Sequence, residues 1–232
     1  MSKVGLIQPG RLGDIIICLP IAKYLATKGY HVIWPIFSNY KQMIADAVDY
    51  VEFIPVTDNV YQTVPSAYQA LRQFGSIPMI DIAATFPGSV CTEEYSRLGD
   101  GFGPEKFDQF KYRLSDVPFA EKWNLQYKRD LEKEEEVYNL YVKSDIYDVV
   151  GLDHSQGRAP FKVESKNQII ELNTKHSIFH WRKILSGAQN IVLVDSAMAN
   201  FVDQIMIPND KILIEKPGQP RPVFKNQWRL IK

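Results

Sequence analysis

The sequence predicts an α/β protein built on parallel sheets. Short apolar runs of strand length alternate with longer segments of helical character, and the first run leads through a glycine-bearing turn into a helix. Polar, small or charged residues follow three of the predicted strands, at the positions where open α/β sheets bind ligands. A chain of 232 residues, 45% of them hydrophobic, can form one large core or two smaller ones.

The start of the chain has the pattern of a βαβ unit. Residues 4–7 predict a strand, residues 15–28 predict a helix, and residues 31–36 predict a second strand. Pro20 falls within the helical segment, so we expect one helix with a bend. The crossover between the two strands is expected to be right-handed.

The turn between the first strand and the helix contains Gly10, Arg11, Gly13 and Asp14. The two glycines allow a sharp turn and a close approach of a ligand to the backbone. Asp14 is placed to cap the helix that follows. Two interpretations of Asp14 therefore stay open, a plain helix cap and a catalytic base.

The alternation continues through the first half of the chain. The pattern predicts helices at residues 40–47 and 66–74 and strands at residues 51–56 and 78–83, which together favour a parallel sheet. Residues 85–116 lose this rhythm and are rich in glycine, proline and aromatic residues. Because irregular segments of this length are usually functional or mobile, we expect an acceptor-binding or lid region there.

Residues 117–141 carry many charged and aromatic side chains, including an acidic run. The run comprises Glu132, Glu134, Glu135 and Glu136. Nothing near it has the spacing of metal ligands, so it predicts a solvated helix face.

The second half opens with a strand at residues 148–152, which is followed by Ser155, Gly157 and Arg158. A hydroxyl, a glycine and an arginine directly after a strand are typical of an anion-binding turn. An ordinary polar loop explains the same residues equally well. Residues 166–172 predict a further strand.

A second ligand-type turn lies nearer the C-terminus. Residues 177–185 predict an amphipathic helix, and a buried strand starting at residue 190 ends on Asp195, Ser196 and Ala197. A helix predicted at residues 199–206 follows, and its free N-terminal amides would suit a phosphate or a sugar. Residues 211–215 predict the last strand, before a loop and a short tail.

The composition indicates which binding partners and which cellular compartment to expect. The 27 basic and 27 acidic residues balance, which disfavours nucleic acid as a partner. The two cysteines have neither metal-ligand spacing nor a disulfide-rich setting, as expected in a reducing cytoplasm. No secretion signal is recognisable, and no apolar run approaches the roughly 20 residues that span a bilayer. These observations predict a soluble cytoplasmic protein.

Two stretches carry a resemblance to a known family. Residues 10–20, which read GRLGDIIICLP, resemble the N-terminal signature of the heptosyltransferase-like GT-B glycosyltransferases, a Gly-Asp pair followed by apolar residues and a proline. Residues 179–202 are similar to the donor-site segment of that family. There Asp195-Ser196-Ala197 stands in place of Asp-Ser/Thr-Gly, and Asn200-Phe201 stands in place of His-Leu.

The resemblance implies a short, divergent GT-B-like protein whose two Rossmann-like parallel-sheet domains face each other across a cleft, the second one small. Residues 1–142 would form the acceptor side, including the irregular insert at about 85–116. Residues 143–232 would bind the nucleotide-sugar donor. The acceptor would be a glycan, a lipid-linked molecule or a small molecule.

The resemblance also implies roles for individual residues. In an inverting reaction Asp14 would act as general base, and Arg11, in the turn with Gly10 and Gly13, would assist with phosphate. Arg158, Ser155 and the amides of Ser196 and Ala197 would stabilise the charge on the leaving diphosphate, so that neither a metal nor another cofactor is required. Gly157 and Asp195 would be further donor-binding residues.

Two other classes stay open. The chain could be a nucleotide or nucleotide-sugar binding module that has lost catalysis, as its short length and altered donor motif indicate. A Rossmann-type dinucleotide enzyme is the weakest alternative, because no Gly-x-Gly-x-x-Gly follows the first strand.

Overall fold

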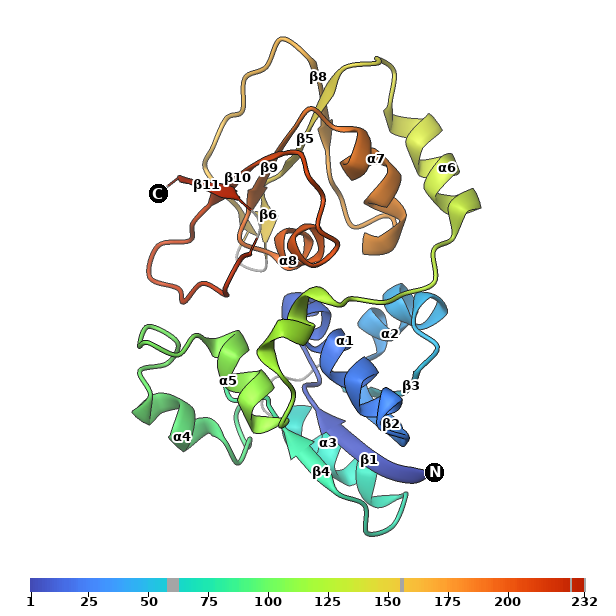
Figure 1. Ribbon diagram of the computed structural model, residues 1–232, viewed down its shortest axis with the longest axis vertical. Helices are drawn as coiled ribbons and strands as arrows, with labels where there is room; N and C mark the ends of the chain where they lie inside the picture. Colours follow the sequence, from blue (N-terminus) through green and yellow to red (C-terminus); the bar gives the residue numbers. More distant parts are fainter. Residues whose placement is uncertain (58–62, 155–156, 226, 232) are drawn as a thin grey trace. The chain divides into compact units, whose positions relative to one another are not determined.

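The chain folds as two α/β units (Figure 1). The computed structural model describes residues 1–57, 63–154, 157–225 and 227–231. The first unit comprises Met1–Lys128 and Pro220–Val223, and the second comprises Arg129–Gln219 and Phe224–Lys232. Each unit is built on its own parallel sheet, which confirms the predicted fold class.

The first unit contains a four-stranded parallel sheet in the order β3-β2-β1-β4. Its strands are β1 (Ser2–Ile7), β2 (Tyr30–Phe37), β3 (Val51–Val56) and β4 (Met79–Asp81). The connecting helices are α1 (Leu12–Thr27), α2 (Ser38–Ile44) with the 3-10 turn η1 (Ala45–Ala47), and α3 (Thr63–Arg72). The strand and helix alternation predicted for this half is thus confirmed, with shifts of a few residues at the ends.

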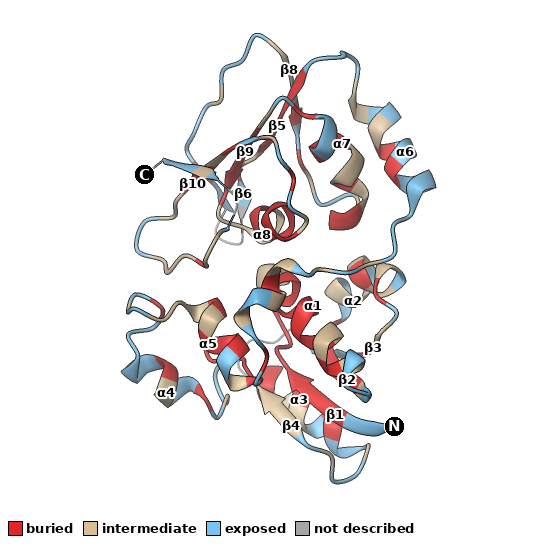
Figure 2. Cartoon of the chain, in the orientation of Figure 1, coloured by how far each residue is buried: buried red, intermediate tan, exposed pale blue. Residues whose placement is uncertain are grey.

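Helix α1 is buried on nearly all sides. Every residue from Ile15 to Ala22 is buried, as expected for a helix whose residues are apolar all round. The helix runs through Pro20 as one element, as predicted. Across the sheet, Gly5 lets α3 pack against β1, because a Cβ there would lie 2.6 Å from Leu71 Cδ1. Figure 2 shows most of α1 and the C-terminal part of β1 coloured as buried.

The segment at residues 85–116 is more regular than predicted. It contains two short helices, α4 (Thr92–Arg97) and α5 (Phe107–Leu114), followed by the 3-10 turn η2 (Phe119–Trp123). The prediction of an irregular insert is wrong here because its aromatic residues form a core of their own. Tyr95 and Phe110 pack there with Ala84 and Cys91. The glycine-rich residues 99–101, all at positive φ, connect the two helices.

A returning segment, residues 220–223, is fastened to the first unit by a buried ion pair. Lys122 Nζ lies 2.6 Å from Asp108 Oδ2, and both side chains are fully buried. The same carboxylate oxygen accepts a hydrogen bond from the Val223 amide at 2.9 Å, and Lys122 donates to the Val223 carbonyl.

The second, smaller unit contains a five-stranded parallel sheet in the order β11-β10-β9-β5-β8. Its strands are β5 (Tyr147–Gly151), β8 (Gln168–Glu171), β9 (Asn190–Val194), β10 (Asp210–Ile214) and β11 (Trp228–Ile231). Its helical elements are α6 (Leu131–Tyr141), η3 (Ile178–Trp181), α7 (Arg182–Gly187) and α8 (Ala197–Gln204). A small antiparallel hairpin joins β6 (Asp153–His154) to β7 (Gly157–Arg158). The tail is therefore an edge strand, β11, where the sequence predicted no strand.

Helix α6 belongs to the second unit, where it packs against η3 and α7. The sequence placed this helix in the first domain, with a boundary at residues 142 and 143, whereas the two units divide after Lys128. Its acidic run is largely a solvated face, as predicted. Glu134 is the exception, because it is buried and accepts a hydrogen bond from Arg129 Nε at 2.7 Å.

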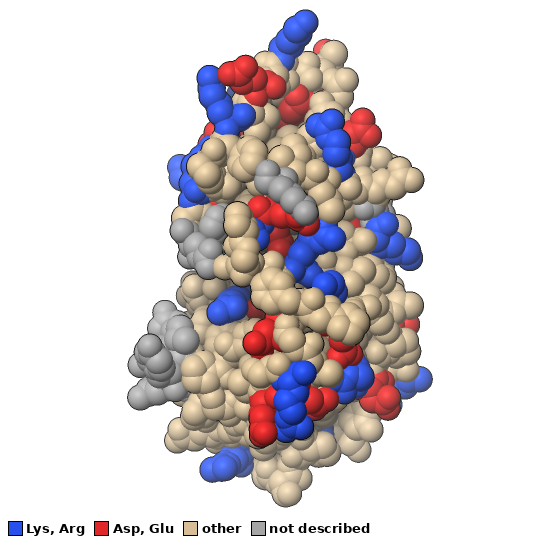
Figure 3. All heavy atoms as spheres, turned by 90° about the vertical axis from the view of Figure 1, so that its left-hand side faces the viewer, with Lys and Arg blue, Asp and Glu red and all other residues tan. Residues whose placement is uncertain are grey.

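The surface carries charges of both signs, as the equal numbers of basic and acidic residues predict. On the face drawn in Figure 3, Lys and Arg side chains are interspersed with Asp and Glu side chains. No helix within the described ranges has the length and apolarity that crossing a membrane requires.

Candidate functional site

In the turn after β1, the residue that bends the backbone is Arg11, whereas the sequence predicted that Gly10 and Gly13 would do so. Arg11 has a φ of 57°, whereas neither Gly10 nor Gly13 is among the described residues at positive φ. Helix α1 begins at Leu12, so Arg11 occupies the cap position, without a side-chain cap bond. Asp14 is the third residue of the helix. The prediction that Asp14 caps the helix is therefore wrong, although the carboxylate still lies in the first turn, where the helix dipole favours an anion.

Gly10 is required by packing inside the protein. A Cβ at this position would lie 2.5 Å from Phe37 Cε2 and 3.1 Å from Phe86 Cζ. The Arg11 guanidinium lies over the Phe86 ring, 5.3 Å from its centroid. These contacts fix the turn against two aromatic side chains and set the direction in which Arg11 extends.

A buried lysine pairs with Asp14. Lys111 Nζ, on α5, lies 3.4 Å from Asp14 Oδ1, and the two side chains are 2% and 12% exposed. Lys111 also donates to the Ile82 carbonyl at 2.8 Å and to Gln8 Oε1. Gln8 in turn donates through Nε2 to the Gly10 carbonyl at 3.1 Å. Hydrogen bonds and one ion pair thus join the end of β1, the turn, α1 and α5.

The groups around Asp14 are buried and polar. Burial raises the pKa of the Cys18 thiol to about 12, the Lys111 ammonium opposes this shift, and the Asp14 carboxylate adds to it. Burial also raises the pKa of Tyr95, and the carboxylates of Asp100 and Asp14 raise it further. Within the described part of the chain, the buried Tyr95 hydroxyl has no hydrogen-bond partner. Asp14 therefore lies in surroundings of low dielectric, where charge interactions are strong.

Two members of this cluster, Lys111 and Gln8, were not predicted from the sequence. Gln8 belongs to the stretch that carries the turn, so its position pointed to this part of the chain. Lys111 lies in the segment that was predicted to be irregular. No spacing in the sequence connects Lys111 with Asp14, because helix α5 brings it there.

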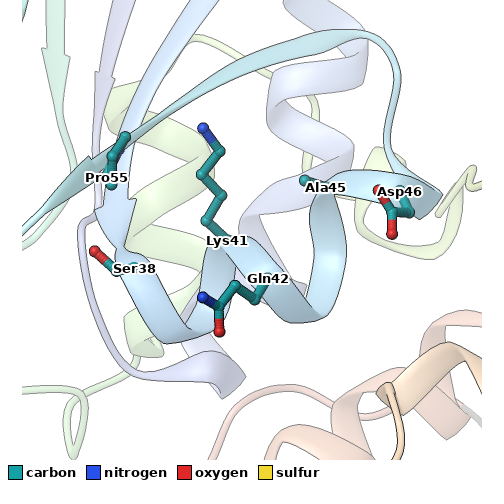
Figure 4. A pocket seen from close by; sticks show the side chains of 6 residues that line it. All are labelled: Ser38, Lys41, Gln42, Ala45, Asp46 and Pro55. Carbon is teal, nitrogen blue, oxygen red and sulfur yellow. The ribbon is translucent and has the colours of Figure 1, made fainter.

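A pocket of about 480 Å³ lies on the first unit, beside the end of β2. Its lining comprises Ser38, Lys41, Gln42, Ala45, Asp46 and Pro55 (Figure 4). The end of β2 is joined to the turn before α1, because the Phe37 amide donates to the Pro9 carbonyl at 2.9 Å. Hydroxyl, amide, ammonium and carboxylate groups together can bind a ligand that carries many hydroxyl groups. The sequence predicted the helix here but gave no sign of the pocket.

In the second unit, two of the predicted turns lie at one edge of the sheet. Strands β5 and β9 are parallel neighbours, so the residues that follow them emerge at the same carboxyl edge. Ser196 is the N-cap of α8, and its Oγ accepts from the Ala199 amide at 3.5 Å. Asp195 precedes this cap, and Ala197 is the first residue of the helix, two residues before the predicted start.

Asn200 folds back onto the start of α8. Its Nδ2 donates to the Ser196 carbonyl at 2.9 Å, and its Oδ1 is buried without a hydrogen-bond partner among the described residues. This asparagine stands where the resembling family has histidine. Asn200 is the fourth residue of α8 and thus lies in its first turn.

The other turn of the second unit is a hairpin. Gly157 has a φ of 111°, which favours glycine, and Arg158 follows it in β7. The Arg158 guanidinium is about half exposed and lies 2.8 Å from Glu171 Oε1 and 3.5 Å from Asp153 Oδ1. Its hydrogen bond to Glu171 raises the pKa of Arg158. Ser155 lies outside the described residues.

The predicted site residues therefore form two groups, each within one unit. Gly10, Arg11, Gly13 and Asp14 lie together after β1. Gly157, Arg158, Asp195, Ser196 and Ala197 lie along the carboxyl edge of the second sheet. Among the residues that the structure describes, no three His, Cys, Asp or Glu side chains are grouped so that they could hold a metal ion.

Solved structures match almost the whole chain. A glycosyl transferase family 9 protein from Veillonella parvula has a TM-score of 0.59 at 11% identity, covering 99% of this chain and 85% of that one. The E. coli ADP-heptose lps heptosyltransferase II has a TM-score of 0.58 at 10% identity, covering 100% of this chain and 90% of the other.

The E. coli heptosyltransferase WaaC, solved with ADP-2-deoxy-2-fluoro heptose, has a TM-score of 0.52 at 14% identity and covers 100% and 93% of the two chains. No protein-family model matches the chain, and no curated protein sequence matches it. The structural likenesses, at low identity, show the fold. It is the GT-B-like α/β fold with two parallel sheets that glycosyltransferases and heptosyltransferases share, as the resemblance in the sequence predicted.

Proposed function

We propose that this protein transfers a sugar from a nucleotide-sugar donor to an acceptor hydroxyl, with inversion and without a metal, and that Asp14 is the general base. The observation that carries the proposal is the position of Asp14. It lies in the first turn after β1 of a GT-B-like fold, it caps nothing, and it is paired with a buried cation. A capping role no longer accounts for this carboxylate, which favours the interpretation as a base.

The reaction needs one proton acceptor and one stabilised leaving group. As the acceptor oxygen attacks the anomeric carbon, the bond from that carbon to the diphosphate breaks and its electron pair goes to the diphosphate. The proton of the acceptor hydroxyl goes to the Asp14 carboxylate. Arg11, held over Phe86 at the cap position of α1, would assist with phosphate.

The donor is assigned to the second unit. The amides of Ser196 and Ala197 at the start of α8 would bind the diphosphate, next to Asp195. Arg158, together with Ser155, would stabilise the charge that develops on the leaving group, and Gly157 would belong to the same donor-binding segment. Two of the similar E. coli structures contain ADP or an ADP-heptose analogue, so ADP-sugars are the first donors to test.

The acceptor is assigned to the first unit. The pocket lined by Ser38, Lys41, Gln42 and Asp46 offers both donors and acceptors for the hydroxyl groups of a glycan, a lipid-linked sugar or a small molecule.

A second candidate function is a nucleotide-sugar binding module without catalysis. Asn200 favours it, because this residue replaces the histidine of the family motif and its Nδ2 is bound to the Ser196 carbonyl. The two candidates differ in turnover. Incubation with a panel of sugar nucleotides and acceptors, followed by measurement of released nucleoside diphosphate, separates them. Release that depends on an acceptor supports the enzyme, and binding without release supports the module.

A further inference from the structure

We propose that Lys111 is a positioning residue for Asp14, which fixes one carboxylate oxygen and leaves the other to receive the proton of the acceptor. This role rests on the proposed function. The cluster that carries it consists of Lys111, Asp14, Gln8 and the Ile82 carbonyl.

The ammonium group of Lys111 has three oxygen neighbours. An ammonium has three N–H donors and no acceptor. It donates hydrogen bonds to two neutral oxygens, Gln8 Oε1 and the Ile82 carbonyl, and it forms an ion pair with Asp14 Oδ1 at 3.4 Å. Because the two neutral oxygens come from the end of β1 and from the residue after β4, they anchor Lys111 to the sheet. Lys111 therefore holds Asp14 at a place that the sheet defines.

One oxygen of Asp14 is left for chemistry. Within the described ranges, the ion pair with Lys111 engages Oδ1, and no hydrogen bond to Oδ2 is formed. When the acceptor hydroxyl loses its proton, the proton goes to Oδ2, the new bond forms between the acceptor oxygen and the anomeric carbon, and the diphosphate leaves with the electron pair. Asp14 is then neutral, but Lys111 keeps its bonds to Gln8 and Ile82. The site thus changes its charge without leaving the buried ammonium unsolvated.

The structure offers a matched comparison for a purely structural lysine. Lys122 is also fully buried, also on the first unit and also paired with a carboxylate, that of Asp108. Its other neighbours include the Val223 carbonyl and the rings of Phe119 and Trp123, so it fastens residues 220–223. Removal of either lysine leaves a buried carboxylate unpaired, and both variants are expected to lose stability. Only Lys111 touches the proposed base.

The test compares turnover and donor binding in five proteins: the unaltered chain, Lys111→Met, Lys122→Met, Asp14→Asn, and Asp14→Asn with Lys111→Met. Turnover is nucleoside diphosphate release at saturating donor and acceptor, expressed per folded molecule from circular dichroism. Lys111→Met is expected to lower turnover at least tenfold more than Lys122→Met does, with donor affinity within twofold of the unaltered chain. In the Asp14→Asn background, Lys111→Met is expected to change turnover less than twofold, because the base it positions is already gone.

Equal turnover in Lys111→Met and Lys122→Met would overturn the proposal. It would also be overturned if the fold-losses in turnover of Asp14→Asn and Lys111→Met multiplied in the double variant. If Lys111→Met does not fold, Lys111→Arg keeps the charge but moves the donor atoms. It is expected to lower turnover several-fold at unchanged donor affinity, and unaltered turnover would reject the positioning role. If the unaltered chain releases no diphosphate with any donor, the proposed function fails and the role of Lys111 with it. If the unaltered chain is active and Lys111→Met has the same turnover as Lys122→Met, only the positioning role is refuted.

Discussion

Lys111 Nζ lies 3.4 Å from Asp14 Oδ1, so a helix from the middle of the first unit supplies the counter-charge for a carboxylate near the start of the chain. Lys111 is buried and the Asp14 side chain is 12% exposed, and Asp14 takes no part in capping α1. An unpaired carboxylate in such surroundings would be strongly disfavoured. The pairing therefore explains how an acidic side chain is kept beside the first turn of a buried helix.

Gly10 tests how tightly this turn is packed. Gly10→Ala would place a Cβ within 2.5 Å of Phe37 Cε2, so the ring or the turn must move. We expect the free energy of unfolding in urea to fall by about 1–3 kcal/mol. Phe37→Leu in the Gly10→Ala background should recover part of that loss, because the ring atoms that would clash are removed. A change below about 0.5 kcal/mol in Gly10→Ala would show that the turn is loosely packed.

Arg158 tests the donor side. Its guanidinium is held by Glu171 and Asp153, so a diphosphate must compete with two carboxylates. We expect Arg158→Ala to weaken nucleoside diphosphate binding about tenfold in calorimetry, because the substitution removes a charge-assisted hydrogen bond. Glu171→Gln should tighten binding several-fold, because it frees the guanidinium.

The matched control for Arg158→Ala is Lys162→Ala, which removes another exposed cation of the second unit, one paired with Glu164. It should leave binding unchanged. If Arg158→Ala and Glu171→Gln both bind the diphosphate like the unaltered chain, Arg158 does not belong to the site.

Cys18 predicts a dependence of stability on alkaline pH. Burial raises the pKa of this thiol from its ordinary value of 9.0 to about 12, so the unfolded chain loses the thiol proton at a lower pH than the folded chain does. The contribution of Cys18 is fully present below about pH 9 and decreases as the pH rises toward 12. Between pH 9 and pH 10 it should lower the free energy of unfolding by about 1 kcal/mol.

The measurement is urea unfolding at the two pH values for the unaltered chain and for Cys18→Ala. Although Cys18→Ala is expected to be less stable, its free energy of unfolding should decrease less between pH 9 and pH 10 than that of the unaltered chain. Equal decreases in both proteins would mean that Cys18 ionises in the folded state as readily as in the unfolded one.

Much of the fold could be predicted from the sequence because hydrophobic periodicity and glycine turns are local signals. The strand at Val51–Val56 matches its prediction residue for residue, and the βαβ opening is found with slightly longer elements. Helices α4 and α5 were missed because each is shorter than about two and a half turns and lies among glycines and prolines. The edge strand Trp228–Ile231 was missed because it depends on pairing with β10.

Residues of the candidate site could be predicted only where they lie in the turn or the first helical turn after a strand. Asp14 and Ser196 are such residues, and the structure places both in a first helical turn or at a helix start. The partner of Asp14 could not be predicted, because Lys111 approaches it through tertiary packing alone. The carboxylates that engage Arg158 were missed for a similar reason, since Glu171 lies on β8, which pairs with β5.

Asp14→Asn is the most direct test of the central claim that Asp14 is the base of a sugar transfer. The substitution keeps the shape of the side chain and an oxygen for Lys111, and Asp14 does not cap the helix, so the turn should be retained. Nucleoside diphosphate release is compared with the unaltered chain, and donor binding is measured by calorimetry. The account predicts that Asp14→Asn loses at least about a hundredfold in turnover while donor affinity stays within twofold. Turnover within about threefold of the unaltered chain would contradict it.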